Sequence, residues 1–77
     1  MRYYFDTWDN DTSFVDKDGV DLPSLDAVKQ EVAATLGGMA RNALYSSGNR
    51  VLTIDVRDQD GRAVLESNLI FEVRELP

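Results

Sequence analysis

One segment of the chain, Ser24 to Ser46, carries a sustained helical pattern and constrains the fold more than any other feature. Its apolar residues recur at steps of three and four, the spacing that places side chains on one stripe of an α-helix. These residues are Leu25, Val28, Val32, Leu36, Met39, Ala43 and Leu44. The pattern predicts one amphipathic helix, and the segments on either side of it have the patterns of strands.

Both ends of the predicted helix are marked by residues that start or stop helices. Pro23 cannot continue a helix from upstream, and Ser24 can accept a first-turn hydrogen bond as the N-cap residue. Asp26 then lies near the positive end of the helix dipole. A turn cluster at residues 46–49 predicts the end.

Gly37 and Gly38 are the weak point of this helix, because a glycine in a helix interior costs roughly 1 kcal/mol relative to alanine. Two alternatives follow. Either packing compensates and the helix is continuous, or the helix bends or breaks at the glycine pair. We expect the continuous helix.

Strands are predicted on both sides of the helix. Before it, an aromatic-rich strand at 2–8 and a short strand at 13–17 form a hairpin. After it, a cleanly alternating strand at 50–57 is followed by a turn, where Gly61 supplies a positive φ beside a bulge. A last strand runs from 62 to about 74.

The element order is therefore ββαββ. Two antiparallel hairpins joined by one helix predict a two-layer α+β fold, with a four-stranded antiparallel sheet and one long helix across one face. A length of 77 residues is typical of a single domain, 1–77. The strand order is left open by these patterns.

The last predicted strand is longer than the partner that its turn provides. With the turn at 58–61, the strand at 50–57 pairs with 62–69 and leaves 70–76 without a neighbour from that hairpin. Two partners fit the remaining length: the strand at 2–8, or the same segment of a second copy. An unpaired apolar edge would be a liability.

The sheet face opposite the helix is predicted to be a mixture of apolar and charged residues. Residues with the phase of the core are Tyr3, Phe5, Leu52, Ile54, Leu65 and Phe71, which leaves Tyr4, Trp8, Val51, Val64 and Ile70 on the opposite face. A solvated sheet face should be mostly polar. Two interpretations stay open: scattered exposed apolar residues, which are common, or an interface with a second subunit or another protein.

Composition narrows the possible functions. The net charge is −6, and residues 6–21 hold six aspartates against Lys17 alone, so we expect no binding to nucleic acid. The chain has no cysteine, no signal peptide and no apolar run of the ~20 residues that a membrane span needs. We expect a soluble, cytoplasmic protein that does not bind membranes.

No motif in the sequence predicts a catalytic, cofactor-binding or metal site. The segment Asp16–Asp21 places glycine at its fourth position, whereas a calcium-binding EF-hand loop needs it at the sixth. Without histidine or cysteine, acid–base chemistry would fall to carboxylates such as Asp6 and Asp55, which could meet across the sheet. We expect the chain not to be an enzyme, and its Asp-Gly clusters to be turn formers.

Three stretches resemble a family of short bacterial proteins of unknown function. They are the opening Arg2–Asp6, the run Asp16–Pro23 before the helix, and the hairpin turn Val56–Arg62. This resemblance covers most of the chain and implies a fold but no activity. A looser likeness is to antitoxin domains of the HicB kind, which also open with an aromatic strand and place a Leu-Pro run before an amphipathic helix; it is an analogy only.

We therefore predict a non-enzymatic protein-interaction module that self-associates as a homodimer. Its interface would use the mixed sheet face or the edge of the last strand. The alternative is an acidic, antitoxin-like regulator that masks a basic protein partner with Asp9, Asp11, Asp16 and Asp18. A third class, a carboxylate enzyme, would need Asp6 or Asp55 with a perturbed pKa in a pocket.

Overall fold

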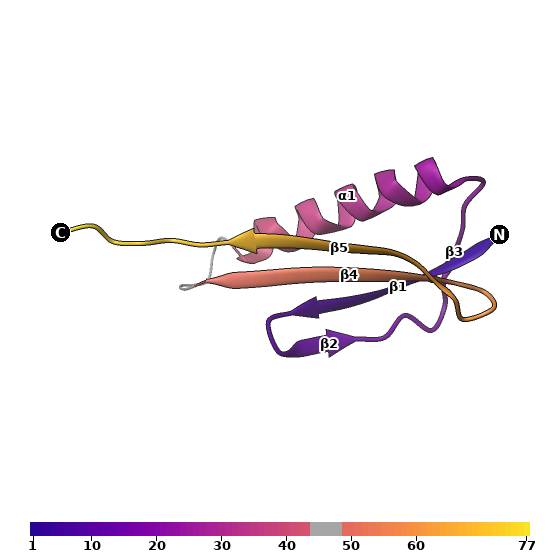
Figure 1. Ribbon diagram of the computed structural model, residues 1–77, viewed down its shortest axis with the longest axis horizontal. Helices are drawn as coiled ribbons and strands as arrows, with labels where there is room; N and C mark the ends of the chain where they lie inside the picture. Colours follow the sequence, from indigo (N-terminus) through magenta and orange to yellow (C-terminus); the bar gives the residue numbers. More distant parts are fainter. Residues whose placement is uncertain (44–48) are drawn as a thin grey trace.

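One helix lies across one face of an antiparallel sheet in the computed structural model, which describes residues 1–43 and 49–77 (Figure 1). The elements, in chain order, are β1 (Arg2–Asp9), β2 (Thr12–Phe14), β3 (Val20–Asp21), α1 (Leu25–Ala43), β4 (Arg50–Asp58) and β5 (Ala63–Phe71). The predicted α+β architecture is confirmed. The structure adds β3, a two-residue strand that the sequence did not predict.

The strand order is β2-β1-β4-β5, and all pairs are antiparallel. β3 pairs with the start of β1, on the same edge as β2. β4 is therefore flanked on both sides along its length, whereas the outer edge of β5 has no strand partner among the described residues. Beyond β5, the C-terminal residues extend away from the other elements (Figure 1).

The helix α1 runs without interruption through Gly37 and Gly38, so the expectation of one continuous helix is confirmed. Ser24 is its N-cap residue, because Ser24 Oγ accepts a hydrogen bond of 3.1 Å from the backbone N–H of Ala27. A Cβ built on either glycine meets nothing within 4 Å. The predicted last residues of the helix, 44–46, lie outside the described residues.

The core is formed where α1 packs on β1 and β4. Its fully or nearly fully buried apolar side chains are Phe5, Val28, Val32, Leu52, Ile54 and Val56. Each side chain of this size contributes about 1.5–3 kcal/mol when fully buried. Tyr3, Leu22, Leu36, Met39 and Leu65 pack around this centre and are partly buried. The strand residues that face this core are the ones that the alternation in the sequence predicts.

The predicted return strand at 13–17 is too long. In the structure β2 ends at Phe14, and Val15 is exposed. The chain leaves the ladder there because the side chain of Asp16, rather than a backbone group, bonds to the next part of β1. A side-chain acceptor of this kind competes with strand pairing.

The expectation that residues 70–76 lack a neighbour in the hairpin is wrong for its first two residues. Ile70 pairs with Val51 and Phe71 with Arg50. At the turn Asp58, rather than Arg57, binds Arg62: Asp58 N–H donates to Arg62 O, and Asp58 Oδ1 accepts from Arg62 N–H. A further register shift at Val56/Arg57, a bulge inside the ladder that the sequence did not predict, adds to the offset.

The first strand does not pair with the last one, so one of the two partners proposed for the overlong strand is excluded. β1 pairs with β4 instead, from Tyr3 opposite Asp58 to Asp9 opposite Leu52. Gly61, with φ of +84°, supplies the left-handed residue of the β4–β5 turn as predicted. Within the described part of the chain, no strand pairs with the outer edge of β5.

Alanine at Gly37 or Gly38 is expected to stabilise the fold by about 0.5–1 kcal/mol each, because both glycines lie in a helix interior with open space around them. Gly19→Ala is the contrasting variant. Gly19 has φ of +72°, and an added Cβ would lie 2.9 Å from Tyr4 Cε1, so we expect a loss of about 1–3 kcal/mol. Urea unfolding measures both effects, and destabilisation at Gly37 or Gly38 would contradict the uninterrupted helix.

Candidate functional site

The sheet face opposite α1, which we call the open face, carries the side chains that could serve a function. Strand register and alternation assign to it Tyr4, Asp6, Trp8, Val51, Thr53, Asp55, Arg57, Glu66, Asn68 and Ile70. Two parts of this face differ in character. Near β2 and β3 it is a closed network of polar bonds, and near β5 it is open and partly apolar.

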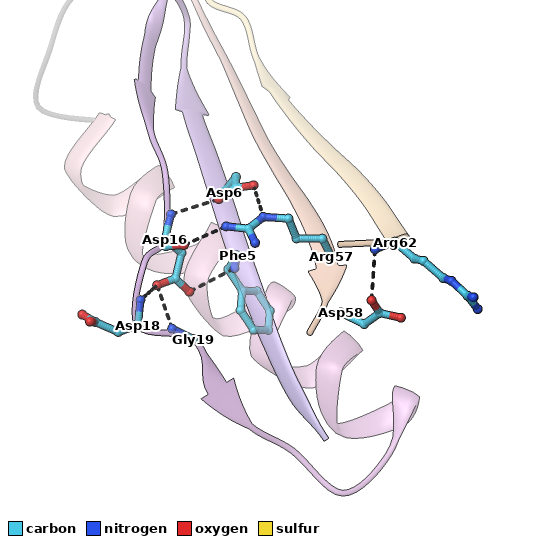
Figure 2. A network of polar contacts seen from close by, with 8 residues as sticks. All are labelled: Phe5, Asp6, Asp16, Asp18, Gly19, Arg57, Asp58 and Arg62. Atoms are coloured by element: carbon cyan, nitrogen blue, oxygen red, sulfur yellow. Dashed lines mark hydrogen bonds and ion pairs between the residues drawn. The ribbon is translucent and has the colours of Figure 1, made fainter. Parts of the chain in front are cut away.

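Asp16 anchors the polar network by taking the place of a missing strand partner (Figure 2). β1 is paired with β3 at residues 2–3 and with β2 at residues 7–9, which leaves a gap between them. In this gap Asp16 Oδ2 accepts a hydrogen bond of 3.1 Å from Phe5 N–H. Asp16 Oδ1 accepts two more of 3.0 Å, from the N–H groups of Asp18 and Gly19. One carboxylate thus fixes both the edge of β1 and the loop beside it.

Asp6 and Arg57 close the network around Asp16. Asp6 Oδ1 accepts from Asp16 N–H at 2.9 Å, and Asp6 Oδ2 accepts from Arg57 Nε at 3.0 Å. Arg57 Nη2 donates to Asp16 O at 2.9 Å, and its guanidinium lies 4.6 Å from the centre of the Tyr4 ring. The three side chains are thereby used within the chain itself (Figure 2).

The electrostatics of this network favour the ionised forms of Asp16 and Arg57. Partial burial by itself would raise the pKa of the Asp16 carboxyl. The backbone N–H groups of Gly19, Phe5 and Asp18, together with the charge of Arg57, outweigh burial and hold this pKa below its ordinary value of 3.8. The hydrogen bond that Arg57 donates to Asp6 raises the pKa of Arg57.

The five residues predicted as an interface do not form one patch. Tyr4 is half-buried under Arg57 and Gly19, so its ring is largely covered by its own chain. Trp8 is half-buried and lies opposite Thr53. Val51 and Ile70 face each other across β4 and β5, and are 45% and 68% exposed. Val64, 39% exposed, lies near the other end of β5. The interface role of these residues stays a prediction.

Three carboxylates lie side by side in one row of the open face. Asp6 is opposite Asp55, and Asp55 is opposite Glu66. The sequence had suggested that Asp6 and Asp55 could meet, but Glu66 was missed, because its place depends on the register of β5. Like charges directly opposite each other are destabilising, and Asp55 Oδ1 is buried without a hydrogen-bond partner among the described residues. No group in the described part of the chain has the arrangement of a metal site.

The backbone of β5 presents alternate groups to the outside of the sheet. Val51 C=O and N–H both bond to Asn10 and therefore point toward β1. By alternation, Leu52, Ile54 and Val56 point toward β5 and bond to its matching residues. The N–H and C=O groups of Glu66, Asn68 and Ile70 must then point away from β4.

The chemistry of β5 does little to protect this open edge. The strand Ala63–Phe71 is nine residues long and contains one charged residue, Glu66, with no lysine or proline. Proteins usually block exposed edges with charges, prolines or short strands, because a free edge pairs with another chain. β5 is therefore the part of the molecule best suited to a backbone-mediated contact.

Two of the four aspartates of the alternative, antitoxin-like interpretation have their carboxylates engaged within the chain. Asp9 forms an ion pair of 2.9 Å with Arg50, and Asp16 lies in the network described above. Asp18 O accepts a hydrogen bond from Arg2, whose guanidinium also pairs with Asp21. Asp11 is exposed in the β1–β2 turn.

Fold and surface together define the class of protein, an α+β domain with an open strand edge at β5. The described residues contain no group that could hold a metal ion. Residues 2–70 match the family described as a domain of unknown function, DUF6894, and the chain belongs to this family. This agrees with the resemblance to an uncharacterised family. Searches of curated proteins and of solved structures gave no significant match. No helix of the described residues is long and apolar enough to cross a membrane.

Asp16→Asn is expected to destabilise the fold by about 1–3 kcal/mol at neutral pH, because an amide cannot accept all three backbone N–H bonds. The pKa of Asp16 is lower in the folded chain, so its contribution to stability is present above its ordinary pKa of 3.8 and is lost as the pH falls through the lower folded value. Urea unfolding from pH 7 downward should therefore show the gap between wild type and variant shrinking in acid.

The matched control is Asp11→Asn, at an exposed turn position. We expect this control to stay within about 0.5 kcal/mol of wild type at every pH. Equal losses for Asp11→Asn and Asp16→Asn, or a gap that is constant with pH, would show that the Asp16 carboxylate does not hold the edge of β1.

Proposed function

We propose that this chain is a non-enzymatic protein-interaction module that self-associates as a homodimer. The observation that carries the proposal is the open edge of β5. A nine-residue strand with a single charge leaves its outward N–H and C=O groups without a strand partner among the described residues. Addition of a strand from another chain is a common way of satisfying such groups.

Exposed apolar side chains next to this edge support the proposal. Ile70 and Val51 are neighbours on the open face, and Leu69 is 37% exposed on the face that α1 covers. Residues at the end of β5 are thus available on both faces of the sheet. Each Å² of such apolar surface that is buried on association would contribute about 25 cal/mol in favour of the dimer.

The proposal of a non-enzymatic role rests on how the carboxylates are used. Asp6 and Asp16 are held by Arg57 and by backbone N–H groups, in bonds that fix the fold. Asp55 is flanked by Asp6 and Glu66, without histidine or cysteine in the chain to act as a base or ligand. The proposed function requires no cofactor.

The net charge of −6 further favours a protein partner over nucleic acid, whose phosphates it would repel. We place the module in the cytoplasm, as a cysteine-free chain that requires no oxidising compartment. The antitoxin-like alternative has weaker support, since Asp9 and Asp16 already have partners within the chain.

Sedimentation equilibrium tests the self-association directly. At micromolar concentration we expect a species of about twice the 8.6 kDa chain mass. Ile70→Glu should raise the dissociation constant at least about tenfold, because it places a carboxylate in the apolar contact.

The control is Val73→Glu, which adds the same charge at a side chain that is 59% exposed but lies beyond β5. We expect this variant to dimerise like wild type. A clean monomer for the wild-type chain would overturn the proposal, and equal weakening by both variants would show that only net charge matters.

A further inference from the structure

We infer that the second copy pairs with β5 edge to edge, in antiparallel register around a two-fold axis at Ser67, and joins the two sheets into one. This inference rests on the proposed self-association and specifies its surface. Two-fold pairing of a strand with itself is self-complementary. If a residue of one copy contacts a second residue in the other copy, the reverse contact also forms between the same two positions. The register is then set by a single residue, the one at the axis.

Backbone geometry limits which registers are possible. In an antiparallel pair, residues whose N–H and C=O groups point toward the partner lie opposite each other. On β5 these are Glu66, Asn68 and Ile70, as shown by the bonds that Val51 makes to Asn10. The axis can therefore pass through Glu66, Ser67 or Asn68 without leaving outward groups unpaired near the centre of the strand.

Side-chain chemistry selects Ser67 among these. With the axis at Ser67, Glu66 lies opposite Asn68 of the second copy, and the whole of Ala63–Phe71 overlaps with its counterpart. The apolar residues match as well: Val64 lies beside Ile70 of the second copy, and Leu65 beside Leu69. Charged residues thus meet an amide, and apolar residues meet apolar residues.

The neighbouring registers are less favourable. An axis at Glu66 places two carboxylates directly opposite each other, which is destabilising. An axis at Asn68 places Glu66 against Ile70, and Val64 against Glu72. Both alternatives also shorten the overlap of the two strands. Charge, hydrophobic matching and length therefore agree on the same register.

The structure already orients Asn68 for this contact. Asn68 Oδ1 accepts a hydrogen bond of 2.7 Å from Thr53 Oγ1, which leaves its amide N–H groups to donate in another direction. In the dimer they reach Glu66 of the second copy. Glu66 lies at the end of the Asp6–Asp55–Glu66 row, where the neighbouring carboxylate of Asp55 repels its own. The side-chain amide of the second copy's Asn68 gives the Glu66 carboxylate a hydrogen-bond donor.

Three of the predicted interface residues gain a common role in this arrangement. Val51 lies beside Ile70 in the same copy, and Ile70 lies beside Val64 of the second copy. They form a continuous apolar row across three strands of the joined sheet, with a second row related by the two-fold axis. Tyr4 and Trp8 lie on β1, two strands away from the edge of β5, and take no part.

Cysteine trapping tests the register, and the chain is suited to it because it has no cysteine of its own. Ser67→Cys is expected to give a disulfide-linked dimer on mild oxidation, because the two Cα atoms at the axis lie roughly 4.5 Å apart in such a pair. The matched variants are Glu66→Cys and Asn68→Cys. In each of these variants the two introduced cysteines, one in each copy, are offset by two positions along the paired strands. Their Cα atoms lie about 8–9 Å apart, which is too far for a disulfide.

Each outcome of the trapping experiment decides the question. Preferential cross-linking of Ser67→Cys supports the inference. Preferential cross-linking at position 66 or 68 overturns the register, and no cross-link in a chain that sediments as a dimer overturns the edge pairing while the proposed function stands. A wild-type chain that sediments as a monomer overturns both.

A charge exchange tests the same register without cysteine, since Ser67 Oγ also donates to Ile54 O and its replacement could affect folding. Asn68→Asp places a carboxylate against Glu66 and should weaken dimerisation at least about tenfold. Adding Glu66→Lys to this variant should restore the wild-type dissociation constant, because lysine then faces aspartate. Failure of the double variant to recover, with circular dichroism showing a folded chain, would overturn the inference.

Discussion

Burial of β4 under α1 is the constraint on which the rest of the structure depends. Leu52, Ile54 and Val56 are almost completely buried, and Val28 and Val32 of the helix lie in the same core. A chain of 77 residues can build only one such layer. The open face and the two sheet edges must therefore be stabilised by other means, and those means determine what the surface can do.

The two edges of the sheet are treated differently. On the β1 edge, the carboxylate of Asp16 accepts a hydrogen bond from Phe5 N–H and fills the gap between β2 and β3. Asp6 and Arg57 bind the backbone N–H and C=O of Asp16. A side chain thus closes this edge within the molecule. The β5 edge has no comparable device in the described residues. Our account assigns its closure to a second copy, so a small domain extends its sheet by association rather than by a longer chain.

The fold was largely predictable because its signals are local. The 3.6-residue periodicity of α1, its Ser24 cap and the alternation of β4 are all visible in short windows. The Asp16 network was not, since it joins residues of three separate segments by side-chain bonds that leave no periodic pattern. Alternation placed Tyr4, Trp8, Val51 and Ile70 on the open face, as the register has them. The grouping of Val51 with Ile70 and of Asp55 with Glu66 depends on a register that a bulge shifts.

Amide hydrogen exchange measured over a range of protein concentrations tests the central claim, that the β5 edge is completed by a second copy. The outward N–H groups of Glu66, Asn68 and Ile70 should become more protected as concentration rises. The N–H of Phe5, bonded to Asp16 within the chain, should keep the same protection throughout. Rapid exchange at all three β5 positions at every concentration, with Phe5 protected, would show that the edge stays open and would contradict the account.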